Sequence, residues 1–184
     1  RVIAANAFRP VRYGGGDLYG IDMCIRLIDS LADKNEDAAL LSVISDCEGF
    51  DDEIDNYKKM IQELGIGDRI MLRLGSVSFP MIIAEADLVV RPTLTDGDAL
   101  TIREALHLGI PVVASDCVER PAGTAIFDSG SMDAFARVCI AQLAGSREAH
   151  ARNEANSSSS YLTAYAQIYG LSLSGTPNAN VSTP

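Results

Sequence analysis

The chain has 184 residues, 47% of them hydrophobic, which is enough for one domain with a real core. Its formal net charge of −10 argues against a nucleic-acid-binding surface and against binding to anionic lipid. No apolar run is long enough for a transmembrane segment and no secretory signal opens the chain, so we expect a cytoplasmic protein.

Short runs rich in Val and Ile alternate with amphipathic stretches along the chain. We predict six strands, at residues 2–8, 39–45, 69–74, 87–91, 111–115 and 124–127. The runs are nearly all apolar, as is typical of parallel strands that are covered on both faces. The alternation therefore predicts an α/β fold, a doubly wound and mostly parallel sheet with helices on both faces.

Three helices are predicted between these strands, from apolar side chains that recur at helical spacing. Their stripes are Ile21, Cys24, Ile25, Ile28 and Leu31; then Ile54, Tyr57, Ile61 and Leu64, ended by Gly65; then Phe135, Val138, Cys139 and Leu143. We predict one domain at 1–146, a polar Ser-rich linker at 147–160, a C-terminal helix at 161–170 and a disordered tail at 171–184.

The four cysteines are widely spaced and fall in apolar runs, without a C-x-x-C pair. We expect reduced thiols in the core at Cys24, Cys47, Cys117 and Cys139.

The chain begins with Arg rather than Met, so we expect a piece of a longer protein. Peripheral attachment of that longer protein at the inner membrane face is left open.

Ligands of such a sheet bind at the carboxyl ends of the strands. Arginines gather there in the sequence, at Arg9, Arg12, Arg73, Arg91 and Arg120. They suggest an anion site, but each could instead pair with a neighbouring carboxylate, and the sequence leaves both interpretations open.

Near the first strand, the glycine run 14–16 is either a flexible turn or a backbone that approaches a phosphate closely. The run matches neither the dinucleotide-binding pattern nor the P-loop pattern.

The segment 91–115 reads as a strand end, an acidic loop, a helix and the next strand. Asp96 lies in the loop and Glu104, eight positions on, in the first turn of the helix. Two carboxylates beside free backbone N–H groups suit a polyhydroxylated, phosphorylated ligand. The alternative is structural, because Thr101 and Glu104 have the spacing of a capping box. No cluster of His, Cys or carboxylates has the spacing of metal ligands.

These residues resemble the C-terminal, donor-binding domain of family 4 glycosyltransferases with the GT-B fold, the glycosyl transferases group 1 type. The family pattern is roughly P-S-x-x-E-G-F-G-L-x-x-x-E-A-x-x-x-G-x-P-V-V-A-S. Its two acids fall on Asp96 and Glu104, and its final residues on 109–115. The segments 64–75 and 84–90 are also similar to the family, and the resemblance covers about residues 1–145. It implies a Rossmann-like half of a GT-B enzyme.

The resemblance implies catalytic roles for four residues. Glu104 would accept hydrogen bonds from the ribose, and Asp96 would hold a hydroxyl of the transferred sugar. Arg9 or Arg12 would neutralise the leaving diphosphate, which the backbone N–H groups at the start of the helix would also face. The implied donor-binding residues are Gly15, Gly16, Ser76, Val77, Gly97, Asp98, Ala99, Leu100, Thr101 and Arg120.

The family's second Gly falls on Ala99, and the chain departs from the family at three further places that bear on donor binding. Asp96 is one carbon shorter than the usual Glu, and Tyr19-Gly20 stands where the family has Lys-Gly. The later Gly-Gly-x-x-Glu is replaced by a segment that contains Arg120, which we offer as the substitute phosphate cation.

We therefore expect the nucleotide-sugar-binding half of a retaining, metal-independent glycosyltransferase, without any cofactor. It would transfer a hexose to a glycan or lipid-linked acceptor in bacterial polysaccharide biosynthesis. The acceptor would bind to an N-terminal domain missing from this chain, so the isolated domain is expected to be inactive in transfer. The alternatives are a nucleotide-sugar epimerase-like GT-B enzyme and a non-catalytic α/β regulatory domain.

Overall fold

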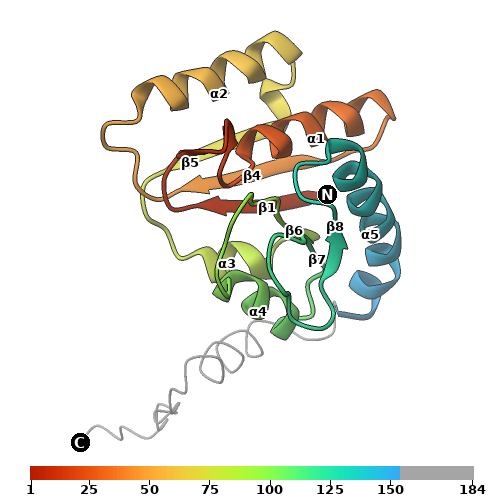
Figure 1. The fold of residues 1–184 in the computed structure, drawn as a ribbon. Coiled ribbons are helices and arrows are strands. Elements are labelled where there is room, and N and C mark those ends of the chain that lie inside the picture. The colour runs from red at the N-terminus through yellow and green to blue at the C-terminus, as the bar shows by residue number, and fades with distance from the viewer. Residues whose placement is uncertain (154–184) are drawn as a thin grey trace, which may run out of the picture.

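A six-stranded, all-parallel sheet forms the centre of the protein (Figure 1). The computed structural model describes residues 1–153. The strands lie in the order β5-β4-β1-β6-β7-β8. Their bounds are Val2–Ala7 (β1), Ala39–Ile44 (β4), Ile70–Leu74 (β5), Leu88–Arg91 (β6), Val112–Ser115 (β7) and Ala125–Phe127 (β8). Each predicted strand is confirmed. In every case the predicted range is one residue longer than the observed strand.

Helices cover both faces of this sheet, as the sequence predicts (Figure 1). They are α1 (Ile21–Asp33), α2 (Asp51–Leu64), α3 (Phe79–Ala84), α4 (Leu100–His107) and α5 (Met132–Asn153). The helices α1, α2 and α5 pack on one face, and α3 and α4 on the other. Side chains that alternate along β1 divide between the two cores, because Ile3 joins the first and Ala4 the second.

The predicted stripes are the buried faces of the helices. All five apolar residues of the α1 stripe are buried, and α2 ends at Gly65, whose φ of 67° is left-handed. Two elements were not predicted: the short helix α3, and an antiparallel hairpin of β2 (Arg12–Tyr13) and β3 (Gly16–Asp17). A short 3-10 turn, Gly67–Arg69, precedes β5.

The C-terminal boundary differs from the prediction. The helix α5 continues to Asn153, so the part of the predicted linker at 147–153 is helical. The rest of that linker, the predicted helix at 161–170 and the predicted tail lie outside the described residues. Within residues 1–153, no helix combines the length and hydropathy needed to cross a membrane.

The strand order reverses between β1 and β6. From β1 the chain proceeds outward through β4 to β5, and it then returns to β6 on the other side of β1. At such a switch point the loops that follow the two strands diverge and leave a crevice at the carboxyl edge of the sheet. The loops after β1 and β6 are therefore the ones that can form a ligand site.

Candidate functional site at the carboxyl edge of the sheet

The loops that follow β1 and β6 lie against each other. The backbone N–H of Leu94 donates to the carbonyl of Leu18 at 2.9 Å. Gly20 has a φ of 66°, and a Cβ there would overlap the carbonyl oxygen of Pro92. Only glycine therefore fits at this contact, where the family pattern also has glycine.

The Asp96 carboxylate lies between two arginines of this edge. Arg91 donates from Nε to Oδ2 at 2.7 Å and from Nη2 to Oδ1 at 3.2 Å, while Arg120 donates from Nη1 to Oδ2 at 3.1 Å. The Gly97 N–H and the Thr93 hydroxyl complete the set, at 2.9 and 3.4 Å. Burial raises the pKa of Asp96, but the hydrogen bonds and charges of the arginines outweigh it and hold the pKa below its usual value.

The two arginines join the ends of three strands. Arg120 donates to the Ser115 carbonyl at the end of β7 at 3.0 Å and to the Thr93 hydroxyl after β6 at 3.1 Å. It also contacts Cys117, with 3.2 Å between Nη2 and Sγ. Arg91 donates to the Asn6 side-chain oxygen on β1 at 3.1 Å. Arg120 was predicted as a phosphate cation; its side chain is only 2% exposed and is surrounded by protein acceptors.

Glu104 lies in the buried side of α4, only 4% exposed. The helix begins at Leu100, its N-cap is Ala99, and no side chain caps it. The capping-box alternative for Thr101 and Glu104 is therefore wrong, because Thr101 lies inside the first turn. Among the described residues, no acceptor is bound to the backbone N–H groups of Leu100 and Thr101. These are the unsatisfied donors of a helix N-terminus, where the partial positive charge favours an anion.

The start of α1, in contrast, is occupied by a carboxylate that the sequence analysis missed. Asp17, 3% exposed, accepts the N–H groups of Tyr19, Gly20 and Asp22 at 3.0 to 3.2 Å. It also accepts the Tyr57 hydroxyl at 2.7 Å, and burial together with this carboxylate raises the pKa of Tyr57 strongly. The available signal was an Asp three residues before Gly20, the residue that precedes α1. The site for an anion at this helix is thus already filled.

The glycine run forms the turn of the β2–β3 hairpin. Gly14 and Gly15 have φ values of 57° and 86°, as a two-residue hairpin turn requires. Gly16 lies in β3, and a Cβ there would meet the Leu94 side chain. The run is thus a turn, as one interpretation predicted, but it closes a hairpin and does not lead directly into the helix, while a contact of Gly15 and Gly16 with a donor stays a prediction.

Most arginines of the edge have a carboxylate partner. Arg9 pairs with Asp46 at 2.6 Å, and this hydrogen bond lowers the pKa of Asp46. Arg103 pairs with Asp98 at 2.9 Å on the exposed side of α4. Arg12 instead donates to the carbonyl of Gly15 at 3.2 Å. The pairing interpretation therefore holds for most of these arginines, while the anion site stays a prediction; Arg12 forms no ion pair within the described residues, although its charge partly offsets the burial that raises the pKa of Asp22.

The predicted base-binding loop follows β5. Gly75 has a φ of 95°, Ser76 is exposed, and Val77 packs partly against the second core. This loop is at the same edge of the sheet as Asp96 and the start of α4, because all six strands are parallel. Its contact with a base stays a prediction.

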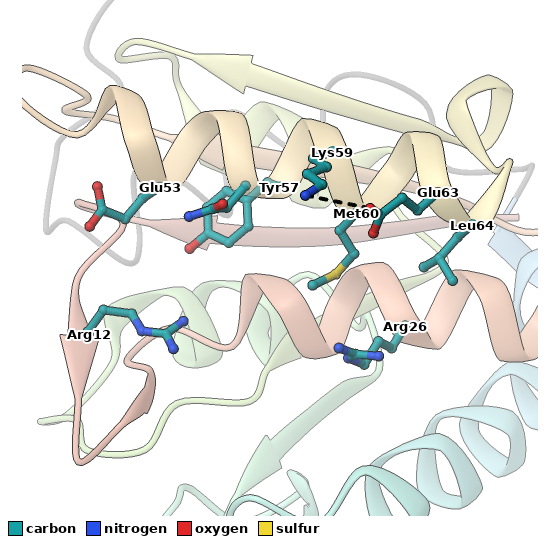
Figure 2. Close-up of a pocket in the computed structure, with 9 residues that line it drawn as sticks. Arg12, Arg26, Glu53, Tyr57, Lys59, Met60, Glu63 and Leu64 are labelled. Atoms are coloured by element: carbon teal, nitrogen blue, oxygen red, sulfur yellow. Dashed lines mark ion pairs between the residues drawn. The ribbon is translucent and has the colours of Figure 1, made fainter.

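A polar groove of about 610 Å³ separates α1 from α2 (Figure 2). Arg12 lies at one end, and Arg26 of α1 faces Met60 and the Lys59–Glu63 pair of α2. Asp96 and Glu104 do not line this groove, and Arg12 is the one predicted site residue that does.

Comparison with known proteins gives a family match. A family model described as Glycosyl transferases group 1 matches residues 14–144. No curated protein sequence matches the chain. The match covers most of the described residues, including β3, α4 and the Asp96 loop, and begins just after β2.

Solved structures share the fold at low sequence identity. The C-terminal domain of the group 1 protein LpcC from Francisella tularensis superposes with a TM-score of 0.63 at 16% identity, covering 78% of this chain and 75% of that one. HepE from Anabaena in complex with UDP gives 0.61 at 20%, with 92% and 47% covered. S. aureus TarM, in a mutant structure that includes UDP, gives 0.60 at 18%, with 91% and 35% covered. The chain thus spans a third to a half of the length of these two UDP-containing structures.

Proposed function

The chain belongs to the glycosyl transferases group 1 family, and on that premise we propose that it binds the nucleotide-sugar donor of a retaining transferase. The observation that carries this proposal is the contrast between two helix starts at one edge of the sheet. The N-terminus of α1 is filled by Asp17, whereas that of α4 has backbone N–H donors without an acceptor among the described residues. A diphosphate therefore binds at the start of α4.

Glu104 is the ribose ligand in this proposal. It lies in the first turns of α4, close along the chain to the N–H groups of Leu100 and Thr101 that face the diphosphate. In a nucleoside-diphosphate sugar the ribose is bonded directly to the diphosphate, so a single helix start can hold both groups. The base then extends toward the loop at Ser76 and Val77.

Arg12 is the cation that stabilises the leaving diphosphate. It lies on the hairpin after β1 and forms no ion pair within the described residues, whereas Arg9 is held by Asp46. Negative charge increases on the diphosphate as the sugar–phosphate bond breaks, and a guanidinium beside it stabilises the transition state. The charge is supplied by arginine and by backbone N–H groups, so we propose a reaction without a metal ion.

The donor sugar is a hexose and the acceptor a bacterial glycan or glycolipid. The chain spans only part of the length of the enzymes it resembles, so the acceptor binds to another domain. We expect the isolated chain to bind donor and to transfer no sugar. UDP is the first nucleotide to test, because the similar structures of HepE and TarM contain it.

The test is calorimetric titration with UDP, GDP, ADP and CMP, followed by the matching nucleotide-sugars. We expect one nucleotide to bind, and Glu104→Gln to weaken it at least about tenfold through loss of the charged acceptor. Glu63→Gln is the matched control, because Glu63 is exposed on α2, away from this edge. Wild-type protein that binds none of the four nucleotides would contradict the proposal and favour a regulatory domain.

A further inference from the structure

We propose that Asp96 is a positioning residue that holds Arg91 and Arg120 at the edge of the sheet and does not bind the transferred sugar. The inference rests on the proposed function, since it concerns the same donor site. It departs from the role that the family resemblance implies for the first acid. The observation behind it is the environment of the carboxylate.

The hydrogen-bonding capacity of Asp96 is filled by the protein. A carboxylate has about four lone-pair positions on two oxygens. Oδ2 already accepts from Arg91, Arg120 and, more weakly, the Thr93 hydroxyl, and Oδ1 accepts from Arg91 and the Gly97 N–H. The side chain is 12% exposed, so little of it faces solvent. A sugar hydroxyl could bind only by displacing one of these donors.

Displacing an arginine would be unfavourable. Arg120 is almost fully buried and has no other carboxylate partner in the described part of the chain. A buried guanidinium that loses its counter-charge costs far more than a neutral hydroxyl gains from one hydrogen bond. The arginines therefore retain Asp96, and the hydroxyl remains in contact with water or with other groups.

The group of Arg91, Arg120 and Asp96 has two positive charges and one negative. Its net charge of +1 lies beside the loop that leads into α4, where the diphosphate is proposed to bind. The aromatic ring of Tyr19, which replaces the usual lysine of the family, lies 5.6 Å from the Arg91 guanidinium carbon. Arg91 thus places a positive charge beside Tyr19, where the family has its lysine. Asp96 fixes the orientation of the Arg91 guanidinium.

The test compares UDP with UDP-glucose as ligands of the full chain, at a temperature where every variant is folded. In Asp96→Asn, we expect both Kd values to rise by about tenfold, because the loop before α4 loses its anchor. The ratio of the two Kd values should stay within about twofold of wild type. A variant that binds UDP as tightly as wild type but loses affinity for UDP-glucose would overturn the inference, because Asp96 would then be a sugar ligand.

Two further variants separate positioning from a general loss of fold. Asp96→Glu keeps the charge between the arginines, so we expect it to restore UDP binding to within about threefold of wild type. Arg120→Lys cannot make the same set of contacts, and should weaken UDP and UDP-glucose by a common factor. Equal UDP affinities for the Glu and Asn variants would overturn the inference. Wild-type protein that binds neither ligand would instead contradict the proposed function, and thermal unfolding of the same variants would still measure the coupling of Asp96 to Arg120.

Discussion

The guanidinium of Arg91 lies over the ring of Tyr19, with 5.6 Å between Cζ and the ring centre. Tyr19 lies in the segment after β1 and Arg91 is the last residue of β6, so their contact helps to hold the two sides of the switch point together. Arg91 is oriented from the other side by Asp96 and Asn6. A cation–π contact in a partly desolvated environment contributes more to the free energy of unfolding than one that is exposed to water.

Replacing Tyr19 by Ala should therefore lower the free energy of unfolding by about 1–2 kcal/mol, through lost cation–π attraction and lost apolar packing. Tyr19→Phe keeps the ring and should change stability by less than about 0.5 kcal/mol. Urea unfolding followed by circular dichroism measures both. Equal losses for the two variants would show that the hydroxyl, and not the ring, is responsible.

Gly20 should be the most sensitive glycine at this edge. Alanine there is forced to a φ of 66° and overlaps the Pro92 carbonyl, so we expect a loss of about 3 kcal/mol. Gly14 is the matched control: its φ is 57°, but a Cβ meets nothing within 4 Å, and Gly14→Ala should cost only about 1 kcal/mol. Urea unfolding of the two variants gives the difference. Similar losses would mean that backbone strain alone, without the Pro92 contact, sets the cost.

Short-range sequence patterns predicted the strands and the amphipathic helices, because these elements depend on residues that are close together in the chain. Strands in this sheet are short and apolar on both faces, and the stripe of α1 has the helical spacing, so both could be identified from sequence. The helix α3 could not, because its six residues are apolar and lack the polar face that gives a helix its period. The capping box failed because the chain enters the helix at Ala99, two residues before the Thr that would have served as the cap.

The position of the candidate site could be predicted from the sequence, but the side chains that pair within it could not. The spacing of Asp96 and Glu104, together with the resemblance, located the region. The partners of Asp96 could not be read from the sequence, since Arg120 is 24 positions away and the Asn6 contact of Arg91 spans 85. Several arginines and carboxylates follow the strands, and only the strand order decides which of them meet. The role of Asp17 was missed for the same reason, because its Tyr57 partner comes from α2.

Asp96 should make the protein sensitive to acid. Its pKa is lowered in the folded state, so its ionised form stabilises the fold fully above the unfolded pKa of about 4. That contribution is lost as the pH falls from about 4 through the lower folded pKa. We therefore expect the stability difference between wild type and Asp96→Asn to be about 3 kcal/mol at pH 7 and to shrink steadily below pH 4.

Urea unfolding at a series of pH values between about 7 and 2.5 tests this dependence. Asp46→Asn is the control, because Asp46 pairs with Arg9 at the surface. Its difference from wild type should be small at every pH, since exposed ion pairs contribute little. A difference for Asp96→Asn that stays constant below pH 4 would show that the arginines do not lower the pKa of Asp96 in the folded protein.

Asp17 should be a stronger determinant of stability than its position in a loop suggests. Replacement by Ala removes the acceptor of three backbone N–H groups at the start of α1 and of the Tyr57 hydroxyl, all in a buried place. Because those donors are then left unsatisfied, we expect a loss of about 2–4 kcal/mol. Asp133→Ala is the matched control, since Asp133 lies in the first turn of α5 but is exposed, and its loss should stay below about 1 kcal/mol. Thermal and urea unfolding measure both, and equal losses would mean that Asp17 acts only through the helix dipole and not through its buried hydrogen bonds.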